Sequence, residues 1–274
     1  MTIFQAVILG IIQGLTEFLP ISSSAHLVIT PYLLEWHIAP DIGFVFDVLV
    51  QMGTLLAVIV YFWADFWAIG RETVVNLVKG RPFASTQSRL GWLIILATLP
   101  AGVIGLAIKD LVEAAFANPI ATACFLLITA VFLVVAERVG KRNRSLEHLN
   151  WKDALTVGFF QAISIFPGVS RSGSTITGAM LRDLERPTAA RFSFLISLPI
   201  MLAAGGLALL DLGQVANLSS YAPVILVGFI TSAVIGYLSI RWLLAYLNRH
   251  TLYGFAVYCA VLSLLVLAVA ALRA

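Results

Sequence analysis

The stretch QGLTEFLPISSSAH, residues 13–26, decides the fold because it breaks an apolar segment with a cluster of polar groups. Glu17 and His26 flank Pro20 and three consecutive serines, and predominantly apolar residues lie on both sides. Each apolar side is shorter than the roughly 20 residues that a helix needs to cross a bilayer. We therefore expect residues 3–35 to form a re-entrant helical hairpin, whose break lines a cavity at membrane depth.

The composition of the whole chain is that of a membrane protein. Of its 274 residues 60% are hydrophobic and 11% are charged, and the mean hydropathy is +0.98. Soluble domains carry about 25% charged residues, and the long continuous apolar segments differ from the short alternating strands of a β-barrel. The sequence predicts an all-α polytopic membrane protein with a single membrane domain, residues 1–274. The net charge of +3 reflects basic loops, so we expect no nucleic-acid partner.

Six apolar segments are long enough to be full transmembrane helices. They are residues 44–69, 89–109, 118–138, 188–211, 221–246 and 251–272. A second region, residues 151–182, resembles the first hairpin, because a polar motif containing Pro167 interrupts it. The predicted fold is therefore six full transmembrane helices plus two re-entrant hairpins.

The basic residues of the loops predict the orientation. Lys and Arg occur in loops 70–88, 139–151 and 247–250 and near the end of the second hairpin, and none occur in loops 110–117 and 212–220. Cytoplasmic loops carry an excess of Lys and Arg. We therefore expect the basic loops in the cytoplasm, and both termini and the first hairpin on the outer side.

The two hairpins share a pattern that indicates an internal repeat. Residues 10–24 align with residues 158–172, which matches glycine with glycine, glutamine with glutamine and two serines with two serines. Three predicted crossings separate the hairpins, so the halves 1–138 and 151–274 would have inverted topology. Such repeats place a binding site near the midplane. Chance similarity between apolar helices is the alternative.

The breaks have the features of an anion site. Serines that precede a helix can cap its N-terminus, where free N–H groups and the helix dipole favour negative charge. Arg171 lies in the second break and can hold phosphate oxygens in a bidentate manner. Phosphate or diphosphate fits best, and the alternative is that Arg171 pairs with Glu17 for structural reasons alone. The candidate binding residues are Gln13, Ser22, Ser24, Ser170, Ser172 and Thr175.

Other polar residues of the first hairpin suggest chemistry. Gln13 and Glu17 share a helix face, and Glu17 could serve as a general base, a metal ligand, a counter-ion or a buried hydrogen-bonded acid. His26 follows Ser23 by three residues, a spacing that suits a nucleophile and its base, although it could also be an ordinary interfacial side chain. Asp47 is a candidate metal contact, and an interfacial position explains it equally well.

These motifs resemble those of the undecaprenyl-diphosphatases, also called bacitracin-resistance proteins. The resemblance rests on residues 13–26 and 167–175, supported by FDVLVQMGT (46–54) and RFSFLISLP (191–199). It implies a hydrolase of the bacterial cytoplasmic membrane that converts undecaprenyl diphosphate to the monophosphate carrier lipid. It also implies dependence on a divalent cation, Mg²⁺ or Ca²⁺, and an active site that opens outward. The family motif begins with Glu or Gln and has Glu four positions later, so Gln13 is expected to position rather than react.

On this resemblance, Arg171 and the serines would hold the diphosphate, while membrane lipid surrounds its prenyl chain. Ser23 is the preferred nucleophile, Ser22 is the next choice, and His26 would act as base or acid. A metal-bound water with Glu17 or His26 as base is the open alternative. The rival function is a transporter or flippase of an anionic polyprenyl lipid, since inverted repeats and broken helices also occur in transporters. The sequence leaves open whether the protein is a homodimer.

Overall fold

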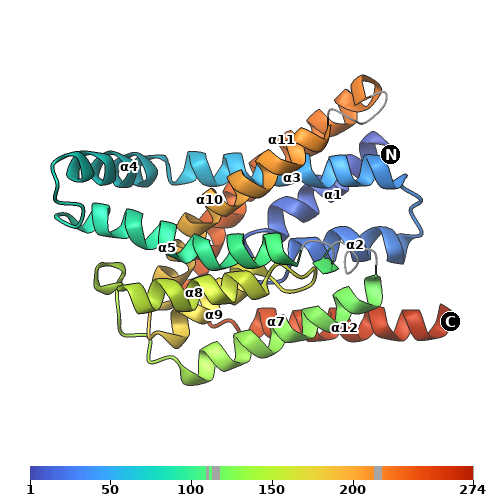
Figure 1. The fold of residues 1–274 in the computed structure, drawn as a ribbon. Helices are drawn as coiled ribbons and strands as arrows, with labels where there is room; N and C mark the ends of the chain where they lie inside the picture. Colours follow the sequence, from blue (N-terminus) through green and yellow to red (C-terminus); the bar gives the residue numbers. More distant parts are fainter. Residues whose placement is uncertain (109–110, 113–117, 213–217, 274) are drawn as a thin grey trace.

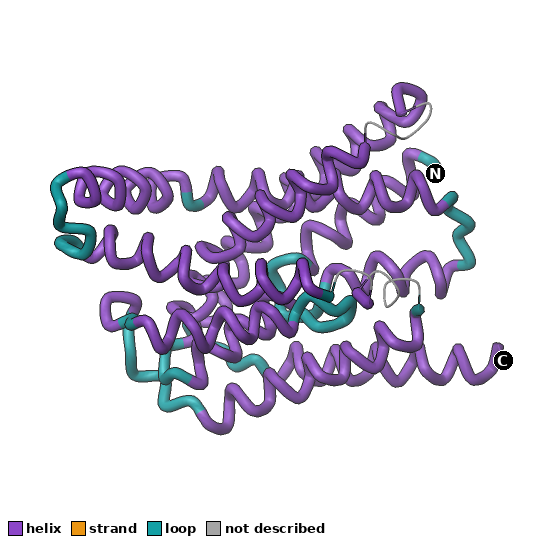
Figure 2. Tube along the Cα trace, in the orientation of Figure 1, coloured by secondary structure: helices purple, strands orange, loops and turns teal. Residues whose placement is uncertain are grey.

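The computed structural model describes residues 1–274 except residues 109–110, 113–117, 213–217 and 274. It also leaves out the side chains of residues 40–41 and 207–220. Within these residues every secondary-structure element is a helix, which confirms the all-α class (Figure 2). The helices are α1 (Ile3–Thr16), α2 (Ser23–Leu34), α3 (Pro40–Tyr61), α4 (Trp63–Val78), α5 (Thr86–Ala107), α7 (Pro119–Val139), the 3₁₀ helix η1 (Leu146–His148), α8 (Trp151–Ile163), α9 (Arg171–Leu181), α10 (Arg186–Leu212), α11 (Leu218–Leu247) and α12 (Tyr253–Arg273).

Six of these helices are long and apolar enough to cross a membrane, so the chain is a multi-pass membrane protein. The segments are Ile42–Tyr61, Thr86–Ala107, Pro119–Val139, Arg186–Gly206, Tyr221–Leu247 and Tyr253–Arg273. Five of them agree with the predicted spans to within a few residues at most ends. Residues 110–117 and 212–220, which contain no Lys or Arg and are predicted to be loops on the outer side, fall largely outside the described residues.

The predicted span 44–69 is wrong as a single helix. Helix α3 ends at Tyr61 and α4 begins at Trp63, with Phe62 between them at φ −102° and ψ 21°. The Phe62 ring is buried, and its centroid lies 6.2 Å from that of Phe194 in α10. The bend places this ring in the core, and the charged residues of α4 explain why that helix does not continue the apolar span.

Two pairs of short helices enter the molecule from opposite ends. In Figure 1, α1 runs from the end that holds both termini to the middle and α2 returns, whereas α8 and α9 do the same from the other end. A capping box starts each pair, at Thr2 for α1 and at Asn150 for α8. Both turns contain a residue with positive φ, Ser22 at 69° and Gly168 at 103°.

The first helix of each pair lies close to a long helix. Helix α1 packs on α11, where a Cβ added to Gly14 would lie 2.7 Å from the Ile235 Cβ. Helix α8 packs on α5, where a Cβ added to Gly158 would lie 2.6 Å from the Ala97 carbonyl oxygen. Side chains larger than hydrogen at these positions would separate the helices, so the glycines set how closely α1 approaches α11 and α8 approaches α5.

A buried carboxylate anchors the second pair at the end where α8 begins and α9 ends. Asp153 of α8 accepts hydrogen bonds from Arg144 at 2.7 and 3.1 Å and from Arg182 at 2.7 Å. Burial raises the pKa of Asp153, but the hydrogen bonds from Arg144 and Arg182 outweigh it and hold that pKa below its ordinary value. The start of α8 is therefore tied to the end of α9 and to the loop before them.

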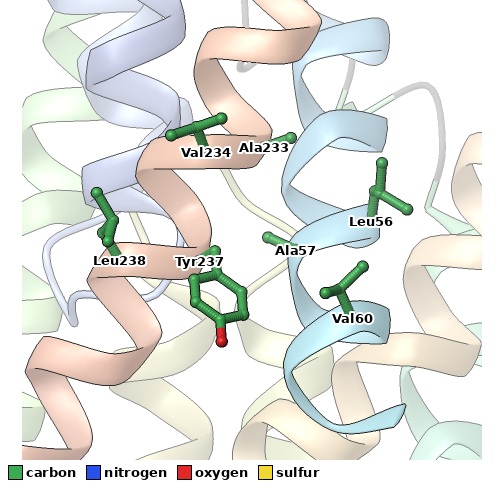
Figure 3. Close-up of a pocket in the computed structure, with 7 residues that line it drawn as sticks. All are labelled: Leu56, Ala57, Val60, Ala233, Val234, Tyr237 and Leu238. Atoms are coloured by element: carbon green, nitrogen blue, oxygen red, sulfur yellow. The ribbon is translucent and has the colours of Figure 1, made fainter.

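An apolar groove lies between α3 and α11 on the outer surface (Figure 3). It has a volume of about 280 Å³, and its most exposed side chains are those of Val60 and Val234. The groove presents hydrocarbon where a membrane protein contacts lipid. The lining residues are Leu56, Ala57, Val60, Ala233, Val234, Tyr237 and Leu238.

Candidate active site

The carboxylate of Glu17 lies at the centre of the polar cluster. Its Oε2 accepts hydrogen bonds from Ser23 Oγ at 2.6 Å and from Gln13 Nε2 at 2.9 Å. Its Oε1 forms an ion pair with the Arg171 guanidinium. The Glu17 side chain is only 4% exposed, so these three donors compensate for the hydration that the carboxylate has lost.

Arg171 connects the second helix pair to the first. It is the first residue of α9, and its side chain is 19% exposed. Besides Glu17, its guanidinium contacts the Met201 sulfur in α10, at 3.1 Å. A buried arginine requires an anionic partner, and Glu17 is that partner in this structure. The structure thus brings together the two charged residues that the sequence singled out.

Equivalent serines cap the two returning helices. Ser22 Oγ accepts a hydrogen bond from the Ala25 amide at 3.3 Å and caps α2, and Ser170 Oγ accepts one from the Gly173 amide at 3.0 Å and caps α9. Because Ser23 and Arg171 are the first residues of these helices and both contact Glu17, the positive ends of two helix dipoles converge on this carboxylate.

Direct hydrogen bonds join the turns of the two pairs. Ser24 Oγ accepts from the Gly168 amide at 3.3 Å, and Ser172 Oγ donates to the Leu19 carbonyl at 3.1 Å. These bonds fix the distance between the helix ends that face each other. Ser24 and Ser172 therefore hold the two turns together.

Two predicted residues have other surroundings than expected. No hydrogen bond in the described residues joins the His26 ring to a serine hydroxyl, because its Nδ1 lies 2.7 Å from the Ser22 carbonyl oxygen and its Nε2 lies 2.7 Å from the Tyr258 hydroxyl. Thr175 is fully buried, and its hydroxyl lies 2.7 Å from the Arg171 carbonyl oxygen and 2.6 Å from Ser193 Oγ. Thr175 thus supports the start of α9 from behind.

The oxygen atoms near Glu17 fit a hard divalent cation. The described residues contain no group of three or more His, Cys, Asp or Glu side chains that could hold a metal ion. However, Gln13 Oε1 is buried without a hydrogen-bond partner in the described residues, beside the Glu17 carboxylate. Mg²⁺ is commonly bound by one or two carboxylates together with substrate phosphates and water, and the Glu17 carboxylate and Gln13 Oε1 are the oxygens here that fit such a site. No hydrogen bond in the described part of the chain links Asp47 to this cluster.

Sequence reasoning missed four contacts of the cluster. Thr54 Oγ1 lies 3.3 Å from Gln13 Nε2, and Ser193 supports Thr175. Both lie in the supporting motifs 46–54 and 191–199, so the motifs contained the signal. Met201 and Tyr258 lie in uniformly apolar segments, and nothing in the spacing of the sequence singles them out.

Comparisons with known proteins agree with these motifs. The family described as "Bacitracin resistance protein BacA" matches residues 6–265. A relative from Chlorobaculum tepidum is 45% identical over 96% of this chain and 95% of its own length, and one from Thermomicrobium roseum is 41% identical over 98% of both. A third, from Moorella thermoacetica, is 43% identical over the full length of both chains. All three are named undecaprenyl-diphosphatase.

Proposed function

Because the chain belongs to the bacitracin resistance protein family, we propose that it is an undecaprenyl-diphosphatase of the membrane. It hydrolyses undecaprenyl diphosphate to undecaprenyl phosphate and inorganic phosphate, which returns the carrier lipid to cell-wall synthesis and gives resistance to bacitracin. The observation that carries this function is the meeting of Ser23, Glu17 and Arg171 at two helix N-termini. A hydroxyl bonded to a carboxylate beside an arginine suits phosphoryl transfer, and it is not required for transport.

The fold that supports this site is an inverted repeat with two re-entrant hairpins, in halves 1–138 and 151–274. Helices α1 and α8 have 14 and 13 residues, too few to cross a bilayer. Two further observations favour a repeat: the serine caps of α2 and α9 are equivalent, and the matched glycines Gly10 and Gly158 each approach a long helix.

The protein lies in the cytoplasmic membrane with both termini outside and the site open to the outer side. The basic loops at the end remote from the termini support this orientation, and Figure 1 places both termini at the same end. The substrate would then enter from the outer leaflet, with its prenyl chain among membrane lipids.

Substrate binding exchanges the partner of Arg171. The terminal phosphate of the diphosphate carries more negative charge than the Glu17 carboxylate and offers more acceptors, so the guanidinium turns from Glu17 to the phosphate oxygens. The free N–H groups at the starts of α2 and α9 bind the remaining oxygens. This exchange leaves Glu17 bonded to Gln13 and Ser23 alone.

Glu17, once released by Arg171, accepts the proton of Ser23. Ser23 Oγ already donates to Glu17 Oε2 at 2.6 Å, within the reach required of a general base. The Ser23 oxygen forms a bond to the terminal phosphorus while the bond from that phosphorus to the bridging oxygen breaks, and undecaprenyl phosphate leaves. Glu17 passes this proton to the departing undecaprenyl phosphate and then takes a proton from the water that attacks the phosphoserine. The bond between the phosphorus and the Ser23 oxygen breaks, inorganic phosphate leaves, and Glu17 returns the proton to Ser23.

A divalent cation would be held by Glu17 and Gln13, and when bound it neutralises charge on the phosphate oxygens. The role of Gln13 in the absence of metal is to orient the carboxylate, since its amide donates to Glu17.

The test is phosphate release from a polyprenyl diphosphate by the purified protein in detergent micelles. We expect release by the wild type and its loss in Glu17→Ala and Arg171→Ala, whereas the control Arg138→Ala, which alters an exposed arginine at the end of α7, retains it. Intact substrate after prolonged incubation with Mg²⁺ and with Ca²⁺ would overturn the function. Label trapped on Ser23 from terminally labelled substrate supports the serine route, and release without any labelled protein would replace that route with direct attack by water.

A further inference from the structure

The ring of His26 is held at both nitrogens. The Ser22 carbonyl oxygen, 2.7 Å from Nδ1, can only accept a hydrogen bond, so Nδ1 carries a proton and donates it. In the neutral imidazole Nε2 then presents a lone pair, which accepts from the Tyr258 hydroxyl at 2.7 Å. The lone pair of His26 is thus directed at α12 and away from Ser23.

Tyr258 contacts this ring in a second way. The two rings are nearly parallel, with an interplanar angle of 5° and a centroid distance of 5.6 Å. His26 is buried, whereas Tyr258 is 44% exposed, so the tyrosine forms the outer wall of the imidazole site. Stacking and the hydrogen bond together allow His26 one ring orientation.

The acceptor of the His26 proton is a strained residue. Ser22 is not glycine, yet it has φ 69°, a region that other residues adopt at a cost and retain only when their surroundings hold them there. Its carbonyl is held by His26, and its hydroxyl caps α2. The next residue is Ser23, so the geometry of Ser22 determines where the Ser23 hydroxyl lies relative to Glu17.

Helix α12 supports the same turn at the neighbouring residue. The Cys259 thiol lies 3.8 Å from the Pro20 carbonyl oxygen, so two consecutive residues of α12 contact the turn and the start of α2. Helix α12 is itself fixed to α7, where Ser263 Oγ donates to the Ala123 carbonyl at 2.6 Å. The brace on the first hairpin is therefore attached to a spanning helix.

From these contacts we infer that Tyr258 is a positioning residue of the phosphatase site, acting through His26 and the Ser22 carbonyl to aim Ser23 at Glu17. The inference rests on the proposed function. It gives His26 the role of an anchor in place of the base or acid that its spacing from Ser23 suggested.

The first test compares Tyr258→Phe with Tyr253→Phe. Tyr253 lies on the same helix, is 40% exposed, and its hydroxyl makes no hydrogen bond in the described residues. We expect Tyr258→Phe to lower kcat by about 10-fold, by analogy with the low end of the loss on removing hydrogen-bond partners of metal-ligating histidines, with KM changed less than about 2-fold. KM is spared because the phosphate-binding groups are intact. Equal kcat values for the two variants would overturn the inference.

A rescue experiment separates an anchor from a base. In His26→Asn the side-chain amide nitrogen can occupy the place of Nδ1 and donate to the Ser22 carbonyl, whereas in His26→Gln the amide lies at the place of Nε2. We expect the asparagine variant to retain a kcat several-fold higher than that of the glutamine variant. The reverse order, or equal loss in both, contradicts the anchoring role.

A spectroscopic measurement on the wild-type protein tests the same inference. It does not depend on the folding of a variant or on enzymatic activity. Imidazole ¹⁵N chemical shifts of the wild-type protein report which ring nitrogen of His26 carries the proton, and the chain has four histidines, which eases assignment. We expect Nδ1 to be protonated at neutral pH, and protonation of Nε2 alone would refute the hydrogen bond from His26 to the Ser22 carbonyl. If the wild type released no phosphate but showed this tautomer, the proposed function would fail, whereas the anchoring of His26 between the Ser22 carbonyl and Tyr258 would stand.

Discussion

Replacing Glu17 with Gln should separate substrate binding from chemistry. In the structure, Arg171 is bound to Glu17, and the diphosphate must compete for it. A charge-assisted hydrogen bond contributes about 1.5–3 kcal/mol and a neutral one about 0.5–1.5 kcal/mol. Glu17→Gln therefore weakens the competing contact by about 1–1.5 kcal/mol, which corresponds to roughly 5- to 13-fold tighter diphosphate binding. The same substitution removes the proton acceptor and should lower kcat by about 10²- to 10⁴-fold.

The binding half of this prediction can be measured with a non-hydrolysable substrate analogue. Farnesyl methylenediphosphonate would be titrated calorimetrically into protein in micelles, with chelator present so that no cation bound at Glu17 contributes. The matched control is Glu147→Gln, which removes an exposed carboxylate from η1 and should bind like the wild type. If Glu17→Gln bound the analogue no better than the wild type, the exchange of partners by Arg171 would be refuted, even if activity were lost.

Substitutions at Gly168 and Asp153, and removal of divalent cations, give three further predictions. Gly168→Ala should lower the thermal unfolding midpoint, because φ is 103° and the added Cβ would lie 2.2 Å from the Thr122 carbonyl oxygen, whereas Gly102→Ala, in open space on α5, should not. Because the folded-state pKa of Asp153 lies below its unfolded value of about 3.9, its contribution to stability is present above that pH and is lost as pH falls through the folded value. Asp153→Asn should therefore show a smaller acid loss of thermal stability than the wild type, and an equal loss would contradict this. Chelation of divalent cations should lower phosphate release by the wild type, and added Mg²⁺ should restore it; full activity in chelator would count against a metal requirement.

The features predictable from the sequence were those in which polar residues interrupt apolar segments. Six long apolar helices, the break after Glu17 and the break before Arg171 all follow from the cost of polar groups in hydrocarbon. The same cost requires an anionic partner for an intramembrane arginine. The sequence favoured an anionic ligand and kept Glu17 as the alternative, and the structure pairs Arg171 with Glu17. The family resemblance carried by these motifs is confirmed by the comparisons.

The remaining features depend on packing between distant residues, which periodicity does not report. The division of span 44–69 at Phe62 places its ring against Phe194 in α10, 132 residues later in the numbering. The environment of His26 is decided by Tyr258, 232 positions away, in a segment as apolar as any other. Local spacing placed His26 beside the serines, and tertiary contacts turned its ring elsewhere.

The bonds between the two turns also bear on how the protein is made. Ser24 and Gly168 are 144 positions apart in the sequence, and Ser172 and Leu19 are 153 positions apart. While the ribosome is still extending the second half, the first hairpin has no Arg171 to neutralise its acid and no partner for its tip. The site is therefore complete only after the chain has been made and inserted through Ser172, and until then the Glu17 carboxylate lacks its arginine.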